Sequence, residues 1–167
     1  LLETMHEKCL AGDKDLQPNV ITYNSVINIF SKTGDGEDAQ QMLELMYKDY
    51  VEGNGSAKPN VQSFTTVIDA WANSKSPQAP ERAEEILRRI QDLSDSRKLD
   101  VKPNALSYSG VIKCWSKSRD NNGQIRAKEL LETMQEKSKA GDKELRPDGV
   151  TYNSVINGFT RKGDAEG

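Results

Sequence analysis

The sequence repeats itself. Four segments share one order of residue types and begin at Tyr23, Phe64, Tyr108 and Tyr152, so their spacings are 41, 44 and 44 residues. One near copy lies close to each end of the chain: PNVITYNSVIN, from Pro18, recurs as PDGVTYNSVIN from Pro147. A period of this length predicts an array of similar units rather than one irregular domain.

Each unit contains two amphipathic patterns with apolar residues at i, i+3, i+4 and i+7, which predict two helices. The stripes of the first helices are Tyr23, Val26, Ile27, Phe30; Phe64, Val67, Ile68, Trp71; Tyr108, Val111, Ile112, Trp115; and Tyr152, Val155, Ile156, Phe159. The stripes of the second helices include Ala39, Met42, Leu43, Met46; Ala83, Ile86, Leu87, Ile90; and Ala127, Leu130, Leu131, Met134. Because one helix hairpin cannot bury its own stripe, we expect an all-α fold, a right-handed α-solenoid of stacked antiparallel helix hairpins.

A proline closes each unit, because it disfavours helix at the residue before it. The expected repeats are therefore residues 20–60, 61–104 and 105–148. Residues 1–19 fit the second helix and linker of a preceding repeat, and residues 149–167 fit the first helix of a truncated one. We interpret the whole chain as a single solenoid segment from a longer protein.

Composition argues against catalysis in this segment. The chain has one histidine and two cysteines, without metal-ligand spacing, and it has neither a phosphate-binding P-loop nor a nucleophile elbow. We therefore expect no enzyme, no metal and no cofactor. No stretch is apolar enough to span a bilayer, so no membrane partner is expected. The net charge of −3 argues against general binding of polyanions, although it allows a local basic stripe.

Small polar residues recur beside the apolar stripe. The residue after each aromatic is Asn24, Thr65, Ser109 or Asn153, and the residue after each linker proline is Asn19, Asn60, Asn104 or Asp148. If successive units stack, Asn24 faces Asn60, and the equivalent pairs are Thr65 with Asn104 and Ser109 with Asp148. Each pair offers one set of donors and acceptors per repeat. An Asn or Asp after proline is also a common helix N-cap, and one residue can serve both purposes.

On these residues the chain resembles the pentatricopeptide repeat family. That family's unit reads V-apolar-T-Y-N-[TS]-[LV]-I, then K-x-G, then A-x-x-[LM]-[LF]-x-x-M, then apolar-x-P-[DN]. The segments VITYNSVIN, SKTGD, AQQMLELM and AKPN follow this pattern, and the resemblance covers nearly the whole chain. The units are longer than the family's usual unit, and we expect the extra residues to extend the second helix or its loop on the outer side.

The resemblance implies binding of single-stranded RNA, with one base read per repeat by two or three side chains. Bases would be read by Asn24, Thr65, Ser109 and Asn153 together with Asn19, Asn60, Asn104 and Asp148. Bases would be sandwiched by Ile21, Gln62, Leu106 and Val150. Phosphates would contact Lys32, Lys117 and Arg161, although cations are favoured at helix C-termini in any case. The family's pairing rule gives the order 5′-(C/U)-A-G-3′.

The resemblance also implies a longer protein that acts in RNA processing, stability or translation in a mitochondrion or chloroplast. Protein partners would bind through the outer helices or adjoining domains. The alternative function is a protein-binding helical-repeat scaffold without RNA contact, as in tetratricopeptide repeats. The acidic charge balance favours this alternative, whereas the recurring polar pairs favour RNA.

Overall fold

The computed structural model describes residues 17–120 and 122–165, and the regular structure in these residues is helical. The α-helices are α2 (Val20–Thr33), α3 (Gly36–Val51), α4 (Val61–Asn73), α5 (Ala79–Asp95), α6 (Ala105–Lys117), α7 (Gly123–Lys139) and α8 (Gly149–Ala165), and two 3-10 turns are η2 (Gly55–Ala57) and η3 (Lys143–Leu145). The predicted all-α repeat solenoid is confirmed. The helix expected near the N-terminus falls on residues 1–16, which lie outside the described residues.

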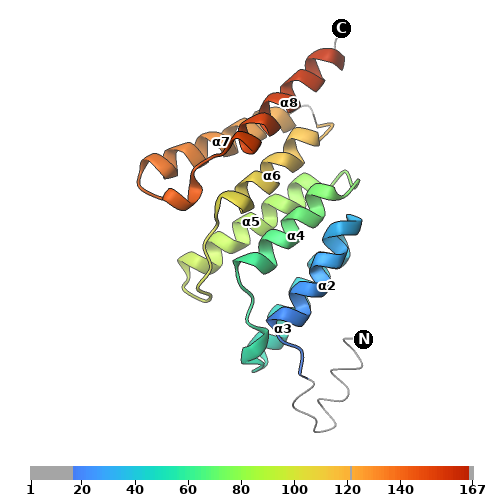
Figure 1. Ribbon diagram of the computed structural model, residues 1–167, viewed down its shortest axis with the longest axis vertical. Coiled ribbons are helices and arrows are strands. Elements are labelled where there is room, and N and C mark those ends of the chain that lie inside the picture. The colour runs from blue at the N-terminus through green and yellow to red at the C-terminus, as the bar shows by residue number, and fades with distance from the viewer. Residues whose placement is uncertain (1–16, 121, 166–167) are drawn as a thin grey trace.

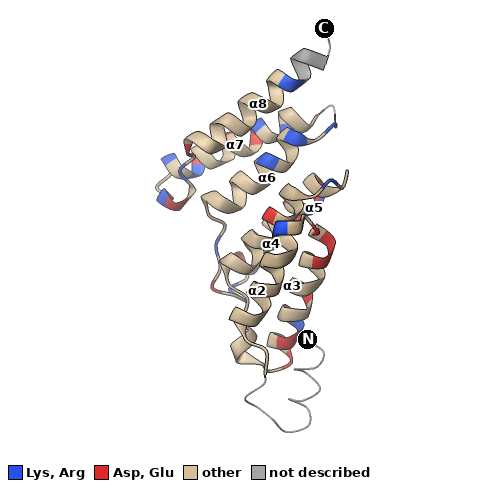
Figure 2. Cartoon of the chain, turned by 45° about the vertical axis from the view of Figure 1, so that its right-hand side comes forward, with Lys and Arg blue, Asp and Glu red and all other residues tan. Residues whose placement is uncertain are grey.

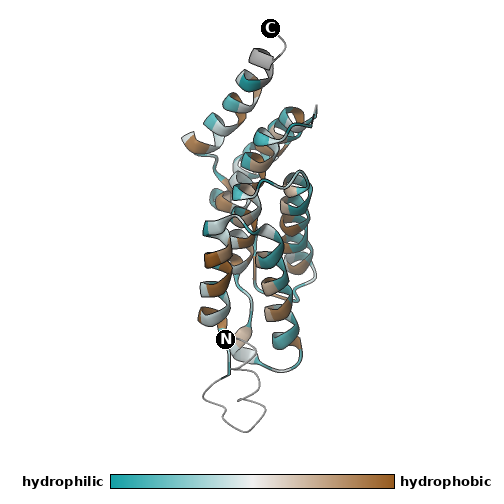
Figure 3. Ribbon diagram, turned by 90° about the vertical axis from the view of Figure 1, so that its right-hand side faces the viewer, coloured by the Kyte–Doolittle hydropathy of each residue, from teal (hydrophilic) through white to brown (hydrophobic). Residues whose placement is uncertain are grey.

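The helices stack in two rows (Figures 1 and 3). The first helices of the units form one row, in which α4 packs between α2 and α6, and α6 packs against α8. Each second helix then contacts the first helix of its own unit and that of the next, so α3 bridges α2 and α4. The row of first helices therefore leaves one face uncovered by the second helices.

The residues after the linker prolines start the first helices. Asn60 has extended backbone angles, and its Oδ1 accepts hydrogen bonds from the Ser63 amide at 3.0 Å and the Ser63 hydroxyl at 3.1 Å. Asn19 and Asn104 form the same capping box with the residue three positions later. Such a cap contributes about 1 kcal/mol, so these residues fix where each first helix begins.

The predicted apolar stripes form the core in the three complete hairpins. Tyr23, Ile27, Leu43 and Met46 are fully buried, and the equivalent residues of the next two hairpins are buried or half-buried. Each helix carries both hydrophobic and hydrophilic residues, as Figure 3 shows. Full burial of one such side chain contributes about 1.5–3 kcal/mol, so these stripes supply most of the stability of the stack.

The fourth stripe lies on a helix as predicted but is largely exposed. Val155 is buried, but Tyr152, Ile156 and Phe159 are 40%, 56% and 44% exposed. In the earlier units this stripe is covered by a second helix, and the described residues contain no second helix beyond α8.

In the two long units the second helix is longer than the first. Helices α5 and α7 are 17 residues long, whereas α4 and α6 have 13, and a 3-10 turn follows α3 and α7. After α3, the buried Asn54 donates through Nδ2 to the Pro18 carbonyl at 2.8 Å and to Asp49 Oδ2 at 3.3 Å. The segment after α3 thus holds the linker in front of α2, and the first helices remain in contact with one another.

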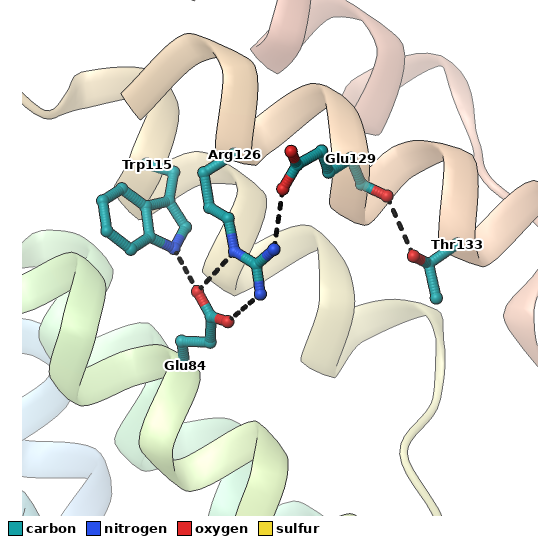
Figure 4. Close-up of polar contacts among 5 residues, drawn as sticks. All are labelled: Glu84, Trp115, Arg126, Glu129 and Thr133. Carbon is teal, nitrogen blue, oxygen red and sulfur yellow. Dashed lines mark hydrogen bonds and ion pairs between the residues drawn. The ribbon is translucent and has the colours of Figure 1, made fainter. Parts of the chain in front are cut away.

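Tryptophans join successive units. Trp71 of α4 donates through Nε1 to Gln40 of α3 at 3.1 Å, and Trp115 of α6 donates in the same way to Glu84 of α5 at 2.8 Å. At the second junction Glu84 also accepts hydrogen bonds from Arg126 of α7 (Figure 4). The two junctions therefore share one geometry but differ in charge.

Candidate nucleic-acid interface

The open face of the first helices carries one exposed residue per unit at the same position in each helix. Ile21, Leu106 and Val150 are 71%, 70% and 69% exposed, and Gln62 is exposed as well. These are the four residues predicted to sandwich bases. Exposed large apolar side chains that recur in register mark a surface able to bind flat apolar groups.

A cavity of about 300 Å³ opens between α2 and α4. Its lining consists of Ile21, Asn24, Ser25, Asn28, Gln62 and Thr66. Asn24 Oδ1 is buried there and has no hydrogen-bond partner among the described residues. Leaving a buried acceptor unpaired costs about 1–3 kcal/mol, so a rotation of the Asn24 side chain that turns this oxygen toward a hydrogen-bond donor in the cavity is favoured. The volume is at the lower end of the range for small-ligand pockets.

The residues after the linker prolines are largely engaged as helix caps. In Asn19, Asn60 and Asn104 the side-chain oxygen accepts hydrogen bonds within the capping box, so the amide group is what remains to meet a ligand. Asp148 accepts from the Thr151 amide at 2.8 Å. The N-cap role of these positions is confirmed, whereas their role in reading bases stays a prediction.

The side chains that follow the aromatic residues of the first helices differ in their exposure to solvent. Asn24 and Ser109 are half-buried and Asn153 is exposed. Thr65 is only 9% exposed, and its hydroxyl donates to its own helix, at 3.0 Å from the Val61 carbonyl and 3.1 Å from the Gln62 carbonyl. Thr65 therefore presents an acceptor and no free proton to the open face.

The predicted phosphate contacts lie at the C-terminal ends of the first helices. Lys32 and Arg161 are exposed. Lys117 Nζ donates to the Ala72 carbonyl at the end of α4, at 3.1 Å, and so caps the preceding helix. Asn73, which breaks the basic series, makes the same contact one unit earlier with the Ser31 carbonyl at 3.2 Å. This position thus supports stacking between units, and contact with phosphate stays a prediction.

Lys113 is a further cation of the open face that was not predicted as a site residue. Its Nζ donates to Asn73 Oδ1 at 3.0 Å, so the third unit supplies a cation where the second unit has none. The signal in the sequence is its place one helical turn after Ser109, on the open face. Burial lowers the pKa of Lys117, and repulsion from Lys113 and Arg161 lowers it further.

Charge is unevenly divided between the two rows (Figure 2). The described side chains of the first helices include one acidic residue, Asp69, against the cations Lys32, Lys113, Lys117 and Arg161. Burial raises the pKa of Asp69, and the neighbouring Lys113 lowers it. Helices α3 and α5 carry more acidic than basic residues. The overall charge of −3 therefore conceals a mildly basic open face.

The described residues contain no group of histidine, cysteine and acidic side chains suited to holding a metal ion. Among the same residues no helix combines the length and apolar character of a membrane span. The Cys114 thiol is buried, and burial raises its pKa to about 12, so it remains protonated and serves as packing in the core.

Comparison with known proteins identifies the repeats. A profile of the PPR repeat family matches residues 18–73, and a profile of the PPR repeat matches residues 150–167. None of the curated proteins compared with the chain matches it. Seven chains of solved structures do, among them the crystal structure of the pentatricopeptide repeat protein PPR10 from maize.

The match to the maize protein has a TM-score of 0.59 and 18% sequence identity, covers 95% of this chain and spans 21% of that protein. At this identity the likeness shows the fold, a solenoid of helical repeats. Together with the two matched repeat profiles and the recurring motifs, it supports a pentatricopeptide repeat protein.

Proposed function

We propose that this chain is a single-stranded RNA-binding segment that holds about one base per repeat along the row of first helices. The cavity between α2 and α4 is the observation that carries the proposal. It combines an exposed apolar wall, Ile21, with a buried oxygen of Asn24 that lacks a partner among the described residues. A base offers both a flat face for the wall and N–H donors for the oxygen.

The proposed base order is 5′-(C/U)-A-G-3′, with one pair of polar residues for each base. Asn24 with Asn60 takes C or U, Thr65 with Asn104 takes A, and Ser109 with Asp148 takes G. The order rests on the family's pairing rule, and the inward position of Asn24 and the cap geometry of Asn60 are compatible with it.

The row of cations supports RNA over a neutral ligand. Burial is the main cause of the lowered pKa of Lys117, and repulsion from Lys113 and Arg161 adds to it. A bound phosphate relieves this repulsion, whereas an uncharged peptide does not. We extend the proposal to a role in organellar RNA processing, stability or translation, in a mitochondrion or chloroplast, as part of a longer protein. The proposed role is binding rather than catalysis.

The test is a titration of fluorescently labelled RNA with the chain, followed by anisotropy. The RNAs contain CAG, the same bases in scrambled order, or A alone. We expect tighter binding to CAG and a shallow salt dependence, with a slope near +2 to +3 in log Kd against log salt, because only three or four cations are available and each phosphate contact on a single strand contributes about 0.7. Equal binding to the three RNAs would contradict the base order, and no binding to any would contradict the function.

The Lys113→Gln variant tests whether the charge of Lys113 contributes to RNA binding. The substitution keeps a hydrogen-bond donor near Asn73 and removes the charge. We expect weaker binding to every RNA and a salt slope reduced by roughly one contact, without a change in base preference. Lys48→Gln is the matched control, since Lys48 is an exposed lysine of the second helix α3.

A further inference from the structure

Two proposed base-reading residues are joined through a third side chain. Ser109 Oγ of α6 lies 2.6 Å from Thr151 Oγ1 of α8, and Thr151 Oγ1 lies 2.7 Å from Asp148 Oδ1. Ser109 is half-buried and Asp148 is exposed, whereas Thr151 is fully buried between them. Thr151 therefore lies behind the open face, where it cannot touch a base.

The direction of the hydrogen bonds follows from the chemistry of the carboxylate. Hydrogen bonds from the Thr151 hydroxyl and backbone amide lower the pKa of Asp148, so this side chain is ionised and accepts hydrogen bonds only. The single hydroxyl proton of Thr151 must then point to Asp148. Thr151 Oγ1 in turn accepts from Ser109, and this commits the single hydroxyl proton of Ser109.

With these hydrogen bonds in place, Ser109 and Asp148 present only hydrogen-bond acceptors to a base. Ser109 retains oxygen lone pairs, and Asp148 is a carboxylate. On its Watson–Crick edge guanine carries two adjacent donors, N1–H and the N2 amino group. Adenine, cytosine and uracil each carry one donor group there, next to acceptors. Guanine therefore matches a pair of residues that only accept hydrogen bonds. With any other base, an acceptor atom of the ring would face an acceptor oxygen of the protein, and no hydrogen bond would form there.

We propose that Thr151 is a positioning residue that fixes the hydrogen-bond polarity of Ser109 and thereby selects a guanine at the third base. This inference rests on the proposed RNA-binding function and deepens it, because it assigns part of the specificity to a residue that does not contact RNA.

The second unit provides an internal contrast. Ser107 occupies the position equivalent to Thr151, and its hydroxyl donates to Asn104 Oδ1 at 3.0 Å. The described contacts of the Thr65 hydroxyl, however, are with its own helix and not with Ser107. Asn104 also keeps amide donors that a carboxylate lacks. Loss of the Ser107 hydroxyl thus removes the same cap without changing the polarity of a base-reading side chain.

The experiment measures anisotropy with two RNAs that differ only in the third base, CAG and CAA. The wild-type chain is expected to prefer G. Thr151→Val keeps the shape of the side chain but removes the hydroxyl, so the preference for G over A should fall by about three- to tenfold, the effect of losing one oriented hydrogen bond. Thr151→Ser should keep the preference, since Ser63 and Ser107 use the same hydroxyl in their units.

Two further variants complete the design. Ser107→Ala removes the equivalent capping hydroxyl from the preceding unit, so it is the matched control for Thr151→Val. This variant should retain the preference for G at the third base. Asp148→Asn keeps a capping oxygen and adds an amide donor, as in Asn60 and Asn104, so it should lower the G preference even if Thr151→Val does not fold.

The outcomes separate the two proposals. If the wild-type chain prefers G and Thr151→Val or Asp148→Asn keeps that preference undiminished, the positioning role is wrong while RNA binding stands. An equal loss in Ser107→Ala also overturns it, because the effect would then belong to capping in general. If the wild-type chain binds no RNA, the proposed function fails and this inference fails with it.

Discussion

The junction between the first two hairpins and the junction between the next two place a tryptophan in the same position but surround it differently. Trp71 is 5% exposed and donates to Gln40, a neutral amide. Trp115 is half-buried and donates to Glu84, which also binds Arg126; Arg126 reaches Glu129 at 2.7 Å (Figure 4). One junction is held mainly by burial and the other by a charged network.

The difference shows how a repeat protein can vary the chemistry of its junctions while keeping its geometry. Burial raises the pKa of Glu84, but hydrogen bonds from Arg126 and Trp115 lower it by more, so its pKa is lower than usual. At the first junction the Trp71 ring packs against Gly36, where an added Cβ would come within 2.5 Å of the ring. We therefore expect the first junction to respond to changes of volume and the second to changes of charge.

The largest expected effect is that of removing a tryptophan. Trp71→Ala should lower the free energy of unfolding by about 3–5 kcal/mol, because it empties a buried site between two units. Trp115→Ala should cost less, since Trp115 is only half-buried. Urea denaturation followed by circular dichroism measures both. A larger loss for Trp115 would reverse the comparison.

Gly36→Ala tests the close packing at the first junction. Alanine normally stabilises a helix by about 1 kcal/mol relative to glycine. Here the added methyl group meets the Trp71 ring, so we expect a net loss of about 1–3 kcal/mol. Gly55→Ala is the control, because nothing lies within 4 Å of its Cβ position. A stabilised Gly36→Ala would show that the ring moves without cost.

Glu84→Gln tests the charged network at the second junction. It leaves Arg126 without its main ionic partner, and we expect a loss of about 1–3 kcal/mol. Gln40→Ala, which removes one neutral hydrogen bond at the first junction, should cost about 1 kcal/mol. A double-mutant cycle of Glu84→Gln with Arg126→Met should show coupling, and additive effects would contradict the network.

The same carboxylate predicts a dependence on pH. Since the pKa of folded Glu84 lies below its unfolded value of about 4.3, its contribution is fully present above that pH and is lost as pH falls through the lower folded pKa. Trp71→Phe leaves Trp115 as the only tryptophan, so its fluorescence reports unfolding near this junction. The stability difference between this protein and its Glu84→Gln derivative should shrink from pH 6 to pH 3. A constant difference would contradict the prediction.

The smallest effect is expected at the rim of the first junction. Arg89 forms an ion pair with Glu44 and lies over the Tyr47 ring, 5.1 Å from its centroid. Because Glu44 is about half exposed, Arg89→Met should cost less than about 1 kcal/mol, and the cost should decline in high salt. A larger, salt-independent loss would assign the effect to packing of the arginine stem.

The sequence was sufficient to predict the fold because the apolar stripes and linker prolines recur in register. It also located the exposed residues Ile21, Gln62, Leu106 and Val150, since their place relative to the aromatic residue is constant. The exposed stripe of α8 agrees with the prediction that residues 149–167 form the first helix of a truncated repeat, since periodicity identifies an apolar face but does not supply the helix that covers it.

Contacts between units were the part that one sequence did not reveal. Lys113 reaches Asn73, and Thr151 joins Ser109 to Asp148, across 40 to 42 positions of the chain. Such pairs depend on the register and rotation of neighbouring hairpins, which the helical period does not fix. The engagement of Thr65 with its own backbone was likewise hidden, because a threonine on a helix face can donate outward or back to the preceding turn.

The most direct measurement for the account as a whole is the base preference of Asn24→Thr. This change gives the first unit the same pair of residues as Thr65 with Asn104 in the second unit. Anisotropy with RNAs that vary only in the first base should then show a change from C or U to A, with the second and third bases recognised as before. An Asn24→Thr protein that keeps the pyrimidine preference, or that never had one, would contradict the claim that the first helices read RNA one base per repeat.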